Sequence, residues 1–195
     1  MTLSGEVEVT AGSIKLNETG TLASTITMSG GTLDVDETST LSGALTQSGN
    51  LTIDVTNGKT LTYSGAAVNT GANTLTLSGG GTLNNTNAFV LNNANSKLLL
   101  NNIVLYKGST SLDNSGIVVN STSTIYELAI GHITPLSIAA GNSLGGAINV
   151  TAGSLKLNET GTLASNVTMS GGTLDADETA AVSGTLSHSA DITID

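Results

Sequence analysis

A long internal repeat constrains the fold of this chain more than any other feature. Residues 1–54 align with residues 142–195 at an offset of 141 residues, and 35 of the 54 aligned positions are identical. A fixed period of this kind is typical of proteins built by stacking equivalent units. The chain therefore holds one whole unit, residues 1–141, and the start of a second, residues 142–195. Because both ends fall inside the repeat, we expect the natural protein to be longer.

A shorter period of about 19 to 22 residues lies inside the long unit. The segment ETGTL at residues 18–22 returns as ETSTL at residues 37–41. Apolar anchors follow this spacing at Leu3, Leu22, Leu41, Leu61, Leu83, near Val104, and at Ile125, Leu144, Leu163 and Val182. Seven short steps make one long unit, so we expect about ten coils of about 20 residues in the whole chain.

Apolar and polar residues alternate between the anchors. In the second coil, Ile26 and Met28 are followed by Leu33 and Val35, each pair separated by one polar residue. This period of two predicts strands with one buried face. Ser-Gly, Gly-Gly and Asn-Gly pairs between the strands predict tight turns. We therefore expect roughly three short strands and three turns in each coil.

The energetics of a single coil require stacking. A coil buries about five apolar side chains, and each contributes roughly 1.5–3 kcal/mol. Ordering about 20 residues costs roughly 1–2 kcal/mol each, so one coil cannot fold alone. Stacking pairs each strand with its equivalent in the next coil, and parallel crossovers are right-handed in the great majority of cases. The sequence predicts an all-β fold: one right-handed, single-stack parallel β-helix, or β-solenoid, over residues 1–195, about 50 Å long.

Composition excludes several classes of function. The net charge is −10, with 5 Lys and Arg against 15 Asp and Glu, and no arginine is present. Nucleic acid and anionic membrane surfaces attract clustered cations, so neither is an expected partner. The chain has no cysteine and therefore no disulfide or thiol chemistry. No stretch approaches the roughly 20 apolar residues of a membrane-spanning helix.

The repeated motifs resemble those of a known group of surface proteins. Ser-Gly-Gly-Thr-Leu occurs at residues 29–33 and again at 170–174, in a chain rich in Thr, Asn, Ser and Gly. These features, over the whole chain, resemble bacterial autotransporter passengers and filamentous-haemagglutinin-like adhesins. The resemblance implies a right-handed β-helix on a bacterial cell surface, with an adhesive, matrix or stalk role.

An acidic patch is the candidate metal site. Its carboxylates are Asp34, Asp36 and Glu37 in the first unit and Asp175, Asp177 and Glu178 in the second. If Leu33 and Val35 point inward, Asp34 and Asp36 point outward on one face. Calcium prefers such oxygen ligands. The two interpretations are a calcium site and a solvated acidic face, and we expect no other cofactor.

An enzyme is not expected. Glycoside hydrolysis requires a carboxylate pair, and the acidic patch is present in both units, whereas an active site usually occurs once. His132 and His188 are far apart in sequence, and position 188 aligns with Gln47. We therefore expect no catalytic residue, and a polysaccharide-degrading β-helix enzyme remains an alternative.

Threonine and aromatic residues raise two further alternatives. Thr-x-Thr recurs at coil spacing, at residues 19–21, 38–40 and 60–62, as in solenoids that order water on ice. Coils five to seven, about residues 83–143, hold nearly all the aromatics and the only proline: Phe89, Tyr106, Tyr126, His132 and Pro135 fall there. These large side chains either form a binding patch or fill a wider stretch of core.

The expected function is structural. We expect a repeat segment of a long extracellular or cell-surface filament, stalk or adhesin, with neighbouring repeats or other copies stacked end to end, since open sheet edges tend to pair. A calcium- or glycan-binding module is the alternative, with a host or matrix glycan as partner. An ice-binding solenoid is the more distant one.

Overall fold

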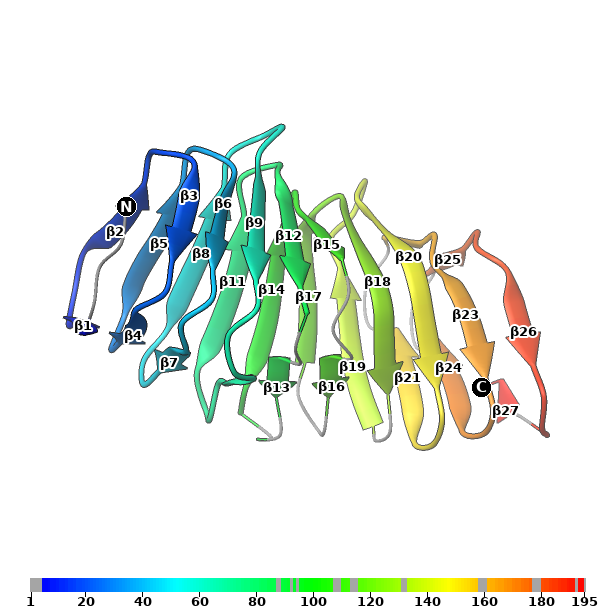
Figure 1. Cartoon of the computed structure of the whole chain (residues 1–195). Helices are drawn as coiled ribbons and strands as arrows, with labels where there is room; N and C mark the ends of the chain where they lie inside the picture. The colour runs from blue at the N-terminus through cyan, green and yellow to red at the C-terminus, as the bar shows by residue number, and fades with distance from the viewer. Residues whose placement is uncertain are drawn as a thin grey trace.

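The structure is a computed structural model. It describes residues 5–86, 89–91, 93, 95–106, 110–112, 116–130, 133–157, 161–176, 180–191 and 193–194. All regular elements in these residues are β-strands, twenty-seven in number. Figure 1 shows them stacked into a single elongated coil with the first and last strands at opposite ends.

Each coil contributes strands to stacked parallel sheets. The ten-stranded sheet contains, in spatial order, β2 (Ser13–Leu16), β5 (Gly31–Val35), β8 (Leu51–Val55), β11 (Thr74–Ser78), β14 (Lys97–Asn101), β17 (Gly116–Ser121), β19 (Ile133–Ile138), β21 (Ser154–Leu157), β24 (Thr173–Ala176) and β27 (Thr193–Ile194). The three-stranded sheet contains β1 (Glu6–Val9), β4 (Thr25–Met28) and β7 (Leu45–Gln47). All ladders between these strands are parallel, as the stacking of equivalent segments predicts.

The fourteen-stranded sheet combines two faces of the solenoid. It contains β3 (Gly20–Leu22), β6 (Ser39–Leu41), β9 (Thr60–Tyr63), β10 (Val68–Asn69), β12 (Thr82–Asn85), β13 (Phe89–Leu91), β15 (Val104–Tyr106), β16 (Thr110–Leu112), β18 (Ser123–Ile130), β20 (Ser143–Val150), β22 (Thr162–Leu163), β23 (Asn166–Met169), β25 (Ala181–Val182) and β26 (Leu186–His188). The faces join because β18 is long enough to pair with both β15 and β16, and β20 with both β22 and β23.

The predicted β-solenoid is confirmed. In Figure 1 the nearer strands run downward and the farther strands upward as the chain advances, which is the sense of a right-handed coil. The ten-stranded sheet takes one strand from each coil, and the last coil contributes only β26 and β27. The number of complete turns is therefore slightly lower than the ten expected.

The core is a set of aliphatic columns that run along the axis. Alternation places every second residue of a strand inward, so Leu33 and Val35 are fully buried while Asp34 between them is not. One such column runs through seven successive coils: Ile14, Leu33, Ile53, Leu77, Leu100, Val119 and Ile138. Each member contacts its neighbours above and below, so burial depends on the adjacent coils.

Two of the sequence anchors, Leu61 and Leu144, do not lie opposite the anchor before them, and Leu144 lies opposite Ser123. Leu61 lies opposite Ser39, and Tyr63 takes the place opposite Leu41. The register shifts because the turn between β8 and β9 is longer than the turn between β5 and β6. The anchor expected near Val104 is the adjacent buried residue, Leu105, while Val104 itself faces outward.

Close approach of successive turns explains a recurrent glycine. A Cβ atom at Gly43 would overlap the carbonyl oxygen of Ser24 in the preceding coil. The equivalent Gly184 of the second unit meets Ser165 in the same way. Only glycine leaves room for the backbones to stack at this spacing.

Candidate functional site

The acidic patch of the first unit lies beside lysines of neighbouring coils. Lys15 of β2 is 3.2 Å from a carboxylate oxygen of Asp34 and 2.6 Å from one of Asp36. Asp34 lies directly opposite Lys15 in the ladder between β2 and β5. Lys59 is 2.6 Å from a carboxylate oxygen of Glu37. All three predicted ligands are thus paired with a cation one coil away.

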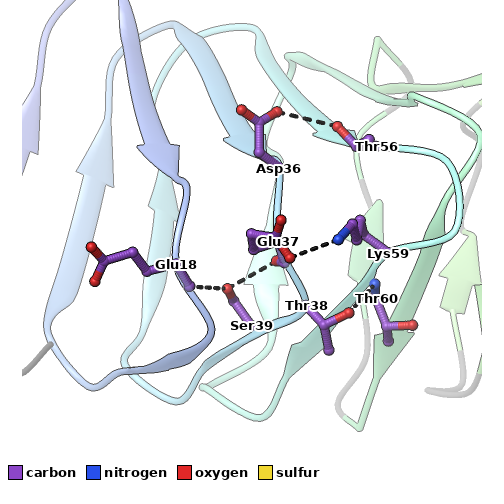
Figure 2. A network of polar contacts seen from close by, with 8 residues as sticks. All are labelled: Glu18, Asp36, Glu37, Thr38, Ser39, Thr56, Lys59 and Thr60. Atoms are coloured by element: carbon purple, nitrogen blue, oxygen red, sulfur yellow. Dashed lines mark hydrogen bonds and ion pairs between the residues drawn. The ribbon is translucent and has the colours of Figure 1, made fainter.

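Hydroxyl groups extend this ladder across three coils, as Figure 2 shows. The Thr56 hydroxyl donates to Asp36 at 3.2 Å, and the Thr60 amide donates to the Thr38 hydroxyl at 3.3 Å. The buried Ser39 hydroxyl lies 3.0 Å from the Glu18 carbonyl oxygen and 2.9 Å from that of Glu37. The contacts join side chains and turns of successive coils.

Glu18 and Glu37 occupy equivalent positions of successive coils, but their carboxylates do not lie together. In Figure 2 the Glu18 side chain extends away from Glu37, whose carboxylate turns toward Lys59. Lysine attraction therefore orients Glu37, and Glu18 contributes its backbone carbonyl to Ser39.

A second pair of stacked carboxylates is Asp34 and Asp54, which lie opposite each other in the ladder between β5 and β8. The Ser78 hydroxyl of the next coil donates to Asp54 at 2.5 Å. The column from Lys15 to Ser78 thus places the two carboxylates between an ammonium and a hydroxyl donor. Both donors offset the repulsion expected between stacked carboxylates.

The ion pair between Lys15 and Asp36 shifts the pKa of both groups. The hydrogen bond to Asp36, followed by the one to Asp34, raises the pKa of Lys15 above its ordinary value. The hydrogen bond from Lys15 is also the largest cause that lowers the pKa of Asp36. These groups are open to solvent, so the pairs are screened by salt and contribute little to stability individually.

The second unit repeats part of the arrangement. Lys156 lies 3.1 Å from Asp175 and directly opposite it in the ladder between β21 and β24. Asp177 and Glu178 lie outside the described residues. Sequence reasoning missed the lysine partners, although the coil spacing that separates Lys15 from Asp34 also separates Lys156 from Asp175.

The lysine partners of the acidic patch compete with any metal ion that would bind there. A cation that bound Asp34 and Asp36 would have to displace the Lys15 ammonium, and one at Glu37 would have to displace Lys59. Within the described ranges, no group of three or more His, Cys, Asp or Glu is arranged to hold a metal ion. The calcium site stays a hypothesis, for which the geometry offers no support.

The two tyrosines of the middle coils do not fill the core, as one interpretation of the aromatic residues expected. Tyr106 and Tyr126 are 45% and 36% exposed, and their rings stack with centroids 4.5 Å apart and an interplanar angle of 19°. Each ring therefore covers a face of the other. Tyr63 is the buried tyrosine: its hydroxyl accepts from the Leu45 amide and donates to the Ala66 carbonyl. The side chain of Phe89, like His132 as a whole, lies outside the described residues.

The threonine ladder is short. Thr21, Thr40 and Thr62 occupy one outward column, and the next two positions of that column are Asn84 and Tyr106. The regular hydroxyl surface thus extends over three coils before amide and aromatic groups replace it. His188 is exposed at the C-terminal end, with Nδ1 3.1 Å from the Ala190 carbonyl oxygen.

Comparison with known proteins adds no relative. No protein-family model, curated protein or solved structure matches the chain. Within the described part of the chain, no helix has the length and apolar character needed to cross a bilayer. The candidate functional features are therefore the inter-coil ladder of Figure 2 and the two ends of the stack.

Proposed function

We propose that this chain is a structural repeat segment of a long filament, stalk or adhesin shaft outside the cell. The observation that carries the proposal is continuity across the repeat boundary. β20 begins just after residue 141, and it pairs with β18 of the first unit and with β22 and β23 of the second. β19 pairs with β21 across the same boundary. A further unit therefore adds length without interrupting the sheets.

The contacts between coils support a mechanical role. Backbone ladders, aliphatic columns and the ladder of Figure 2 all connect residues one coil apart, so each coil is held by its neighbours. Stability in such a stack is a sum of coil and interface terms, so the shaft grows in length at nearly constant stability per coil. No catalytic step forms part of this proposal.

Composition supports an extracellular setting on a bacterial surface. The chain is rich in small polar residues, is free of cysteine and resembles surface adhesins in its repeated motifs. Its partners in this proposal are neighbouring repeats or other copies of itself. A host or matrix glycan would be a partner of the whole adhesin.

Negative-stain electron microscopy of the purified chain over a concentration series tests the proposal. We expect straight particles about 50 Å long, from about 4.8 Å per coil, that join end to end as concentration rises. Single rods at every concentration would exclude self-assembly and leave the shaft role. Round or irregular particles would overturn the shaft role itself. Melting curves recorded with and without calcium test the alternative function, because only a calcium-binding module gains stability from the ion.

A further inference from the structure

The same residues occur in two surroundings in this molecule. Coil one, formed by β1, β2 and β3, is the sequence equivalent of coil eight, formed by the second half of β20 with β21 and β22. Coil eight lies on coil seven, while coil one ends the stack. Val9 and Ile14 are only partly buried, whereas their equivalents Val150 and Leu155 are fully buried. The missing burial marks the surface that coil seven covers in the internal copy.

The joint between coils seven and eight shows what fills that surface. Ile138, at the end of β19, lies over Gly161: the Gly161 amide donates to the Ile138 carbonyl at 3.0 Å, and a Cβ at Gly161 would overlap the Ile138 side chain. Two further bonds cross the joint, from the Thr162 amide to Asn142 at 3.0 Å and from the Ala164 amide to Leu144 at 2.8 Å.

A pocket occupies the equivalent place at the N-terminal end. Gly20, the equivalent of Gly161, lines it together with Leu16 and Leu22. All the lining residues belong to coils one and two. Leu16, one of the lining residues, is partly buried and packs against the aliphatic core.

Differences between the two copies also separate by face. In β1 the outward residues are Glu6 and Glu8, where the second unit has Ala147 and Asn149. The inward positions stay aliphatic in both copies, including Val9 and its equivalent Val150. In this strand the inward positions therefore stay aliphatic while the outward residues differ.

We infer that the N-terminal end of the solenoid is a docking surface for the last coil of another 141-residue unit of this kind. The Ile138 side chain of that unit enters the pocket over Gly20, and its sheets continue into β1, β2 and β3. The inference rests on the proposed shaft function and specifies the joint between its units. The internal joint at Gly161 is its structural template.

Hydrogen exchange on a two-unit protein tests this inference. The protein consists of residues 1–141 joined directly to the full chain. The added unit then meets residue 1 at the same point of the repeat at which residue 141 meets residue 142. We expect the amides of residues 20–23 in the second unit to exchange at least about tenfold more slowly than in the full chain alone, approaching residues 161–164. Ile138→Asp in the added unit should remove most of this gain. Ser137→Asp is the matched control, because residue 137 faces outward.

The outcomes distinguish this inference from the shaft proposal. Residues 20–23 that exchange equally fast in both proteins, or an added unit without protected amides, would overturn the docking surface. Equal effects of Ile138→Asp and Ser137→Asp would overturn the role of the pocket. Stiff single rods in the microscope alongside either result would leave the shaft proposal intact, since it depends on the rod and not on this joint.

Discussion

The second and third coils of the molecule and its last two coils have closely similar sequences but different surroundings. Leu41 is fully buried, whereas its equivalent Val182 is 41% exposed. Ile53 is 2% exposed and its equivalent Ile194, at the C-terminal end, is 64% exposed. The residue type is apolar in every case, so the adjacent coil determines burial. In this fold a side chain becomes part of the core only when both neighbouring coils are present.

Truncation of equivalent isoleucines should separate the two regions most strongly. We expect Ile53→Ala to lower the free energy of unfolding by about 2–5 kcal/mol, because it leaves a cavity in a buried aliphatic column. Ile194→Ala should change it by less than about 0.5 kcal/mol, because that side chain already contacts water. Urea denaturation of both variants measures the difference. Equal losses would show that the ends are as well packed as the middle.

A methyl group at equivalent glycines tests how rigidly the coils are held. Gly43→Ala should cost about 1–3 kcal/mol, because the new Cβ meets the Ser24 carbonyl between fixed coils. Gly184→Ala meets the equivalent Ser165 carbonyl, but Gly184 lies in the last coil, which is held from one side only, so its cost should be smaller. Thermal unfolding compares the two variants. A larger loss of stability for Gly184→Ala than for Gly43→Ala would contradict the expectation that the last coil adjusts to the added methyl group.

Buried Tyr63 and exposed Tyr106 should respond differently to loss of the hydroxyl group. Tyr63→Phe removes a buried hydroxyl and leaves the Leu45 amide and the Ala66 carbonyl without that partner, at a cost of about 1–3 kcal/mol. Tyr106→Phe keeps the exposed ring stack and should cost less than about 0.5 kcal/mol. Denaturation midpoints measure both. A negligible effect of Tyr63→Phe would mean that water replaces the hydroxyl.

The smallest expected effect concerns the exposed ion pairs. The pKa of Asp36 is lowered, so its contribution is present above the ordinary carboxyl range and is lost as the pH falls through it. The raised pKa of Lys15 means that its contribution is present below the ordinary lysine range and is lost at higher pH. Lys15→Met should therefore reduce stability slightly between about pH 4 and pH 10, and less at high salt.

The equivalent ion pair of the second unit, Lys156–Asp175, provides an independent test of the same prediction. Lys156→Met removes the partner of Asp175 and should show a salt-sensitive loss of the same sign. Melting temperatures across the pH range, at low and high salt, provide the measurement. A loss that persists in concentrated salt would indicate that the lysine methylenes, and not the charge, stabilise the ladder.

The sequence predicted the architecture because its dominant signal is a period. A repeat of about 20 residues with alternating Leu, Ile and Val leaves few folds other than a solenoid. It could not locate the register shift at Tyr63, since anchors were chosen by residue type, and a tyrosine with an internally satisfied hydroxyl replaces leucine there. The fifth-coil anchor could be placed only near Val104, because Leu105 beside it is also apolar and alternation alone could not choose between them.

The candidate site was less predictable from sequence than the fold. Asp34 was correctly expected to face away from the core, because alternation fixes its side of the strand. The partnership of Lys15 with Asp34 and Asp36 depends on the spacing between coils and on side-chain reach, which a search for acidic clusters ignores. The exposure of Tyr106 and Tyr126 depends on which face of β15 and β18 they occupy.

The number of coils in the long unit has a consequence for how such a gene can change. Lys15–Asp34 and Lys156–Asp175 lie on the same ten-stranded sheet, because the unit contains a whole number of coils. Unequal recombination between copies that removes or inserts one unit would therefore keep every surface motif on its original side. The length of the solenoid can therefore vary between descendants without rotating its surface motifs, so length and surface chemistry are free to evolve separately.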